Sequence, residues 1–335
     1  MLKITRIICL ALTFFCLVIA TVVGALAIYY SNLPMVLRPV AAGIFAVVAI
    51  GLIVFGLRQG RRWLWGVFLF LLGIMTTAWW LLIPPSNNRS WQPDVTILPW
   101  AEVSENTATV HNIRNVEYRT ETDYTVRHYD RSFDLTTLQS LDLFLVYWGS
   151  PSIAHTMLSF GFANGSYLSF SIETRKEVGE EYSAVKGFFK QFELTYVVAD
   201  ERDIVRLRTN YRQGEDVYLY RLDVPMDFAR KVLLDYLKEI NSLKDHPEWY
   251  RAIFTNCTTS ILRHTTPFNP NPRFDWRFIV NGYLDEMLYE RGLIDKSLPF
   301  AELKERSLIN RQARLADQAD DFSHLIRAGL PAMEP

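Results

Sequence analysis

The sequence predicts an α+β domain that follows three transmembrane helices. The first 85 residues contain three long runs without a charged residue. The rest of the chain alternates short apolar runs with turn signals and then changes to apolar residues at helical spacing. Because the strand-like segments precede most of the helical ones, an α+β fold is favoured over alternating α/β.

The three apolar runs cover residues 7–30, 39–57 and 63–85. Each is close to the roughly 20 residues that cross a bilayer core as a helix. Basic residues precede the first run and fill the loop between the second and third, namely Lys3, Arg6, Arg58, Arg61 and Arg62. Such residues favour the cytoplasmic side, so the N-terminus is expected in the cytoplasm and residues 86 onward on the extracytoplasmic side of the membrane. We expect the first run to be retained; the alternative is a cleaved signal peptide, because small residues follow a basic start.

The soluble part divides into a linker leading into the domain, residues 86–109, and the domain itself, residues 110–335. Strands are predicted at 141–148, 155–162, 167–172, 194–199 and 217–222. Asn164-Gly165 between two of them indicates a hairpin. Helices are predicted at 226–243 and 277–290, and a further helix is expected to begin near Cys257.

The net charge of −1 gives no indication of a nucleic-acid partner. Of the three cysteines, Cys9 and Cys16 lie in the first apolar run. Cys257 is therefore alone in a compartment that usually favours disulfides. Such a thiol is either buried and inert or present for its reactivity.

Cys257 lies in the segment FTNCTTSILRH, where Thr255 or Asn256 is suited to be a helix N-cap. The thiol then falls in the first helical turn, where unpaired N–H groups and the helix dipole favour an anion. The same N–H groups suit an oxyanion formed when a thiolate attacks a carbonyl. Asn256 and Thr258, which flank the thiol, are the candidates for these helix-cap and oxyanion contacts.

A thiol nucleophile needs a base, and His155 is the candidate because it opens a predicted strand. His264 lies seven positions along the helix, roughly 10 Å of rise from Cys257, which is too far for direct contact. If the helix continues that far, His264 is expected to cap its C-terminal end. Glu173, on the strand after the hairpin, is the candidate to orient His155. With a two-residue loop Glu173 would point away from His155, whereas a three-residue loop with Gly165 in the left-handed conformation would make them face each other. The sequence leaves both loops open.

A zinc site made from His155, Cys257 and Glu173 is the metal-binding alternative, but no short ligand spacing supports it. We therefore expect neither a metal nor a cofactor. A histidine on a strand beside a helix start that carries cysteine is the arrangement of papain-like enzymes. Here the histidine would precede the cysteine along the chain, opposite to the order in papain itself.

Several segments resemble the periplasmic domain of the Lnb family of bacterial lipoprotein N-acyltransferases. They run from Tyr129-Asp130-Arg131 through DLFLVYWGSPSIAHTMLSFGF and YLSFSIETRKEVGEEYS to FTNCTTSILRH, over roughly residues 110–270. The resemblance implies a permuted papain-like fold, as in the NlpC/P60 and lecithin–retinol acyltransferase groups. It also implies that Cys257 is the nucleophile and His155 the base.

The chemistry implied by this resemblance is acyl transfer. A phospholipid would donate the acyl chain to Cys257 as a thioester, and the N-terminal amine of a lipoprotein would accept it as an amide. In this chain the apolar runs precede the domain, whereas in the best characterised members of the family membrane spans follow it.

Two other functions therefore stay open. An extracytoplasmic cysteine hydrolase, a peptidase or amidase acting on cell-wall peptides, would use the same Cys257 and His155 in a polar open cleft. A non-catalytic membrane-tethered scaffold would have Cys257 fully buried and far from His155. An acyltransferase would instead have a hydrophobic channel that opens toward the bilayer.

Overall fold

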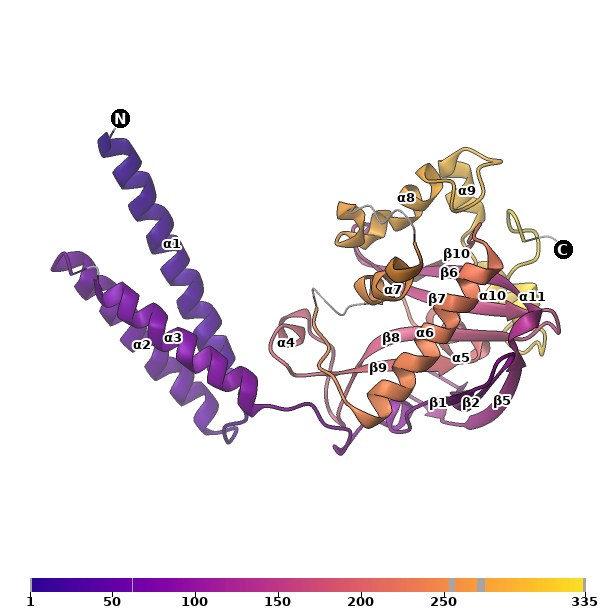
Figure 1. Ribbon diagram of the computed structural model, residues 1–335, viewed down its shortest axis with the longest axis horizontal. Coiled ribbons are helices and arrows are strands. Elements are labelled where there is room, and N and C mark those ends of the chain that lie inside the picture. The colour runs from indigo at the N-terminus through magenta and orange to yellow at the C-terminus, as the bar shows by residue number, and fades with distance from the viewer. Residues whose placement is uncertain (1, 62, 253–256, 270–274, 334–335) are drawn as a thin grey trace. The chain divides into compact units, whose positions relative to one another are not determined.

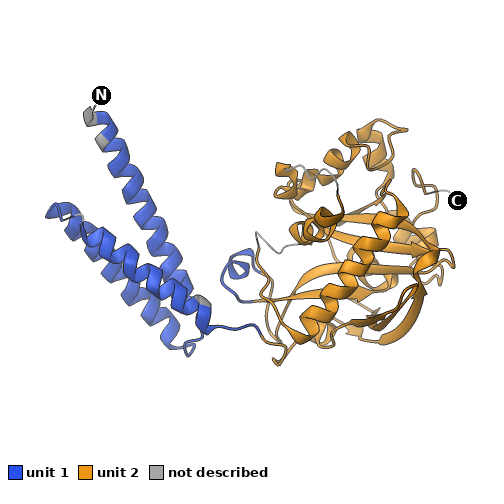
Figure 2. Ribbon diagram, viewed as in Figure 1, with its two compact units in different colours: residues 1–85, 183–191 blue, residues 86–182, 192–335 orange. Residues whose placement is uncertain are grey.

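The computed structural model describes residues 2–61, 63–252, 257–269 and 275–333. The chain forms two compact units, shown in Figure 2. Unit 1 comprises Met1–Pro85 together with Ser183–Gln191, and unit 2 comprises Ser86–Tyr182 and Phe192–Pro335. A short piece of the soluble region therefore groups with the N-terminal helices.

Unit 1 contains α1 (Leu2–Tyr29), α2 (Leu37–Arg58) and α3 (Trp63–Leu82), which Figure 1 labels. Among the described residues, two stretches are long and apolar enough to cross a membrane, Ile7–Tyr29 and Leu37–Arg58. The apolar part of α3, Trp63–Trp79, is shorter. Most large apolar side chains of these helices are exposed, as expected for side chains that face lipid. The helices thus support a membrane anchor, while the predicted third span stays a prediction.

Unit 2 is built on one large sheet with the strand order β1-β2-β9-β8-β7-β6-β10, in which β5 also pairs with β2. Neighbouring strands are antiparallel except β2 and β9, which pair in parallel. The strands are β1 (Trp100–Val103), β2 (Thr107–Arg114), β5 (His128–Asp134), β6 (Leu138–Trp148), β7 (Ala154–Phe162), β8 (Tyr167–Arg175), β9 (Glu193–Ala199) and β10 (Glu215–Arg221). A separate small ribbon joins β3 (Glu117–Tyr118) to β4 (Tyr124–Thr125).

Helices cover both faces of this sheet. Side chains of consecutive strand residues point to opposite faces, so each strand contributes to a core on either side. Leu143 and Leu145 of β6 pack in the same core as α6 (Met226–Asp245), which crosses one face in Figure 1. Phe144 and Val146 pack in a second core. That core also contains residues of α5 (Glu201–Arg206), α10 (Asn310–Leu315) and α11 (Phe322–Leu325). The result is a three-layer α+β unit, which confirms the predicted class.

The remaining short helices lie in the segments that connect the strands and helices named above. They are α4 (Ala184–Gly187), α7 (Cys257–Thr265), α8 (Leu284–Glu290), α9 (Phe300–Arg306), the 3-10 turns η1 (Pro93–Val95), η2 (Leu135–Thr137), η4 (Thr266–Phe268), η5 (Trp276–Phe278) and η6 (Asn281–Tyr283), and the π-helix η3 (Leu207–Tyr211).

The predicted strands and the helix at 226–243 are confirmed, with ends that differ by a few residues. The single helix predicted at 277–290 is wrong over its first half, which divides into η5 and η6 before α8. Gly282 explains the break. A Cβ at this position would lie 2.1 Å from the carbonyl oxygen of Pro151, so the chain passes against another backbone there.

Residues 86–109, expected as a linker, fold as part of unit 2 and contain η1, β1 and the start of β2. The backbone N–H of Ser86 donates to Glu193, and the side chain of Asn87 donates to the carbonyl of Leu243. Trp91 is buried. The polar, proline-containing composition of these residues is typical of a linker. The contacts could not be predicted because each involves a residue far away in the sequence.

The hairpin between β7 and β8 has the three-residue loop. Gly165 has φ +77°, and its N–H donates to the carbonyl of Phe162. The N–H of Phe162 donates to the carbonyl of Ser166. Along the ladder Met157 lies opposite Ser171. Continued toward the strand ends, this register aligns His155 with Glu173.

A buried ion cluster ties the C-terminal region to the sheet. The guanidinium of Arg327 lies 2.8 Å from Asp142 on β6 and 2.7 Å from Glu201 on α5. All three side chains are almost fully buried. Breaking such a pair from one side leaves a carboxylate without its partner in a low-dielectric core.

We predict that Arg327→Met lowers the free energy of unfolding by about 3–5 kcal/mol, because it leaves the buried Glu201 without its cation and Asp142 with Arg221 alone as its ion-pair partner. The matched control is Arg306→Met, which removes an exposed pair with Glu302 and should cost about 0.2–1 kcal/mol. Denaturant unfolding of the full chain in detergent, followed by near-UV circular dichroism, measures both. Equal losses for the two variants would contradict the structural role of the cluster.

Candidate active site

The helix expected near Cys257 is α7, in which Cys257 is the first described residue, and the side chain of Cys257 is partly accessible. Its Sγ lies 3.9 Å from the carbonyl oxygen of Ala154, which directly precedes His155 on β7. It also lies 3.9 Å from the amide nitrogen of Asn281. The predicted cap residue Asn256 lies outside the described residues, so its role stays a prediction.

Asn281 is a site residue that the sequence did not identify. Its side-chain oxygen accepts from the N–H of Ala154 at 2.9 Å, and its nitrogen donates to the carbonyl of Ala154 at 2.6 Å. The same nitrogen donates to the hydroxyl of Thr258 at 2.5 Å. One buried amide therefore continues the hydrogen bonding of β7 and holds the start of α7 beside it. The one signal in the sequence was the neighbouring Gly282, which interrupts the helix predicted at 277–290.

Thr258, expected at the helix cap or oxyanion contact, has a buried hydroxyl. Besides the bond from Asn281, this hydroxyl lies 3.3 Å from the hydroxyl of Thr156 on β7. Its side chain thus fixes α7 against the strand. The proposed contribution of its backbone N–H to an oxyanion site stays a prediction.

His155 and Glu173 face each other across β7 and β8, joined through Ser171. The Nε2 of His155 lies 2.7 Å from the hydroxyl of Ser171, and this hydroxyl donates to Glu173 at 2.7 Å. The direct distance from Nε2 to the carboxylate is 3.8 Å. Because the single hydroxyl hydrogen goes to the carboxylate, Nε2 must donate, which leaves the lone pair of neutral His155 on Nδ1.

Arg208 influences the protonation states of both His155 and Glu173. Its guanidinium lies 3.1 Å from the carboxylate of Glu173. Burial alone would raise the pKa of Glu173, but Arg208 and His155 lower it well below its ordinary value. Burial, followed by the positive charge of Arg208, lowers the pKa of His155 to about 3. At neutral pH the site therefore contains a neutral imidazole next to an ionised carboxylate.

The thiol and the imidazole belong to separate contact groups on opposite faces of β7. Strand alternation places His155 on the sheet face of Ser171, while Thr156 points to α7. No hydrogen bond joins these two described side chains, Cys257 and His155. Nucleophile–base hydrogen bonds are often long before substrate binds. Cys257 is partly accessible, which differs from the fully buried thiol expected of a scaffold.

Residues 124–282 match the family model of the Lnb N-terminal periplasmic domain. This segment belongs to the Lnb N-terminal periplasmic domain family. It spans His155, Glu173, Cys257 and Asn281. No curated protein and no solved structure matches the chain. The family and the apolar N-terminal helices support a membrane-anchored protein with a periplasmic domain and a role in lipoprotein processing.

The pKa values of three tyrosines are sensitive to the charge of Cys257. Burial and then the charge of a Cys257 thiolate raise the pKa values of Tyr182 and Tyr250. Cys257 also contributes, after burial and Tyr196, to the raised pKa of Tyr236. The hydroxyl of Tyr236 is buried without a hydrogen-bond partner among the described residues.

His264 of the Lnb domain does not cap its helix. Its Nδ1 lies 2.7 Å from Asp235 on α6, and its Nε2 lies 2.7 Å from the hydroxyl of Tyr196 on β9. The imidazole is buried. His264 therefore anchors the last turn of α7 to α6 and the sheet, and so fixes the direction of the helix that presents Cys257.

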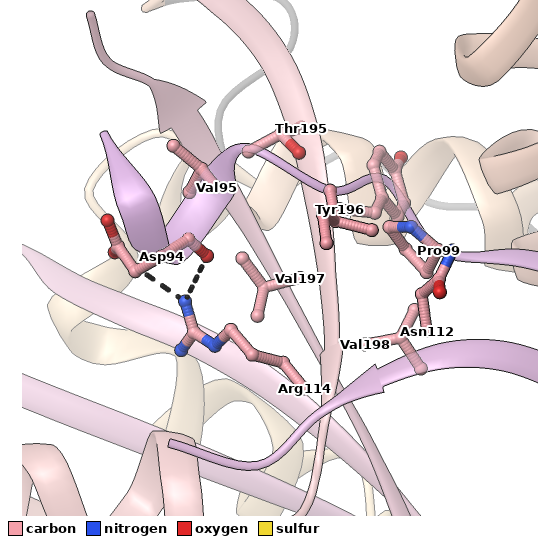
Figure 3. Close-up of a pocket in the computed structure, with 10 residues that line it drawn as sticks. Asp94, Val95, Pro99, Asn112, Arg114, Thr195, Tyr196, Val197 and Val198 are labelled. Carbon is pink, nitrogen blue, oxygen red and sulfur yellow. Dashed lines mark hydrogen bonds and ion pairs between the residues drawn. The ribbon is translucent and has the colours of Figure 1, made fainter. Parts of the chain in front are cut away.

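A small pocket of the Lnb-containing unit lies elsewhere, between the segment of Asp94 and strands β2 and β9 (Figure 3). Arg114 crosses it and donates to the carbonyl of Asp94. The pocket holds about 10 Å³, at the limit for one water molecule. It is far too small for an acyl chain, and none of the thiol-site residues lines it.

Among the described residues, no group of three or more His, Cys, Asp and Glu side chains is arranged to hold a metal ion. The zinc alternative for His155, Cys257 and Glu173 thus receives no support. The neighbours of Cys257 are instead an amide, a hydroxyl and a carbonyl.

We predict that Arg208→Met raises the pKa of His155, because it removes the cation that disfavours imidazolium while leaving Glu173. NMR titration of protein with ¹³C-labelled histidine, assigned with His155→Gln, measures this. The wild-type His155 signal should stay constant between pH 5 and 8, and the variant signal should titrate at higher pH than the wild type. A wild-type His155 that titrates near pH 6.5 would contradict the charge assignment.

Proposed function

We propose that this protein is a membrane-anchored thiol acyltransferase that moves an acyl chain from a phospholipid to the N-terminal amine of a lipoprotein. Cys257 is the nucleophile, His155 the general base, and Glu173 orients His155 through Ser171. The observation that carries the proposal is the Ser171 hydrogen bond, which orients neutral His155 with Nδ1 as the acceptor on the strand beside the thiol. The family match over this segment supports lipoprotein processing.

The first half-reaction forms an acyl-enzyme. Sγ of Cys257 attacks the ester carbonyl while its proton passes to Nδ1 of His155. The C–S bond forms and the ester C–O bond breaks. The lysophospholipid leaves as an alcohol after taking the proton from His155, so the imidazole returns to its neutral form.

The second half-reaction transfers the chain to the amine. The lipoprotein amine attacks the thioester carbonyl and gives a proton to His155, the N–C bond forms, and the C–S bond breaks. His155 then returns the proton to the leaving thiolate. A thioester suits this acceptor because it holds the acyl group in an activated form.

The charges favour general-base catalysis over a resting thiolate–imidazolium pair. Burial and Arg208 disfavour imidazolium, so proton transfer accompanies attack on the carbonyl. Glu173, ionised at neutral pH, stabilises the imidazolium that forms transiently. General-base assistance of this kind is typically worth about 10²–10⁴ in rate. Nδ1 must approach Sγ when substrate binds.

The membrane topology is part of the proposal. α3 would be a third span, the N-terminus would be cytoplasmic with α1 retained, and unit 2 would be periplasmic. The basic residues before α1 and between α2 and α3 support this orientation. The phospholipid donor would then lie in the leaflet on the side of the catalytic unit. A permuted papain-like fold agrees with the chain order of His155, Glu173 and Cys257.

We predict that purified protein incubated with bacterial phospholipids gains the mass of one acyl chain. The adduct should be absent from Cys257→Ala and should be removed by hydroxylamine, because it is a thioester. Intact-mass spectrometry measures it, and Cys9→Ala and Cys16→Ala are the matched controls that should keep it. A reactive Cys257 without an acyl adduct would favour the hydrolase, and an unreactive Cys257 would contradict both enzymes.

We predict that acyl-enzyme formation keeps its rate as the pH falls from 7 to about 5, because His155 has a pKa of about 3 and stays neutral. An ordinary histidine base would lose activity below about pH 6.5. Stopped reactions at several pH values, read by intact mass, give the profile. An acid limb near pH 6.5 that is absent from His155→Gln would show that the base is not held neutral.

A further inference from the structure

The loop between β8 and β9 contains a segment that belongs to the membrane unit. The ring of Phe189 stacks on Tyr30, which follows α1, at 5.4 Å between centroids. It also meets Trp79 of α3 edge-on at 6.3 Å. The side chain of Gln191 donates to the carbonyl of Tyr30 at 2.9 Å. These contacts hold residues 183–191 against the ends of α1 and α3.

The contact points lie where a bilayer interface is expected. Tyr30 and Trp79 are amphipathic aromatic residues at helix ends, which is where interfacial belts occur. The ammonium of Lys190 lies 3.4 Å from the carbonyl of Ile83, just beyond α3, and 5.8 Å from the ring of Trp79. A lysine beside an interfacial aromatic agrees with a head-group position.

Two large apolar side chains of the same segment remain uncovered. Val185 is 47% exposed and Phe188 is 53% exposed. They are three positions apart around the turn of α4, so they share one side of it. Lys186, between them, is partly exposed. Exposed apolar residues next to lysines, on a segment attached to membrane helices, are typical of insertion into a lipid surface.

We propose that Ser183–Gln191 is a membrane-surface anchor whose Val185 and Phe188 insert among the acyl chains of the periplasmic leaflet. The occupant of this apolar surface is the lipid bilayer. The anchor is an insertion between β8 and β9, and it belongs to unit 1 although both strands belong to unit 2. For its consequence this inference rests on the proposed function: an anchor inserted in the leaflet that supplies phospholipid would help the enzyme to act on that substrate.

The first test is photocrosslinking of the full chain in vesicles of phosphatidylethanolamine and phosphatidylglycerol. Phe188 is replaced by p-benzoylphenylalanine, and the same replacement at Leu315, which is 81% exposed on α10, is the matched control. We expect phospholipid adducts by intact mass at position 188 and few at position 315. Equal adducts at both positions, or a crosslink from position 188 to a second copy of the chain, would overturn the proposal.

The second test is Val185→Ser with Phe188→Ser, compared with Leu315→Ser. The ratio of kcat/KM on phospholipid in vesicles to kcat/KM on a short-chain monomeric phospholipid should fall roughly tenfold, since apolar area no longer inserts. Iodoacetamide labelling of Cys257 checks folding. An unchanged ratio would contradict the anchor. Absence of acyl transfer by the wild type would instead contradict the proposed function, and crosslinking would still test the anchor.

Discussion

The site depends on the side-chain amide of Asn281. This one group bonds both backbone atoms of Ala154 and the hydroxyl of Thr258, and its nitrogen lies 3.9 Å from the thiol of Cys257. It therefore joins the start of the histidine strand to the start of the cysteine helix. The close approach of Gly282 to Pro151 is what allows the amide to reach this place.

A second constraint acts on the protonation state of His155. His155 is confined between a carboxylate that favours its protonation and an arginine that opposes it, in a place where burial also opposes it. The balance leaves a neutral base with a defined tautomer. Transient protonation is then compensated by Glu173 through Ser171, while Arg208 prevents the carboxylate from becoming protonated. In the proposed mechanism the same arrangement would serve acylation and deacylation, because both steps would pass one proton through the imidazole.

Local sequence patterns predicted much of this arrangement. The strand of His155, the helix start at Cys257 and the hairpin at Gly165 follow from apolar runs and turn residues, and the three-residue loop was one of two registers that the sequence allowed. Asn281 was missed because its partners are more than 20 positions away along the chain and its neighbourhood has the periodicity of an ordinary helix. The folded part of residues 86–109 and the attachment of residues 183–191 to the apolar helices were missed for the same reason.

The central claim is that Cys257 and His155 work as a pair, and 1,3-dibromoacetone tests it directly because it bridges a thiol and an imidazole only when they approach closely. The account predicts, by peptide mapping of the treated full chain, a single bridge between Cys257 and Nδ1 of His155 that is lost in His155→Gln and kept in His264→Gln. Alkylation of Cys257 without a bridge to His155, or with a bridge to another histidine, would contradict it.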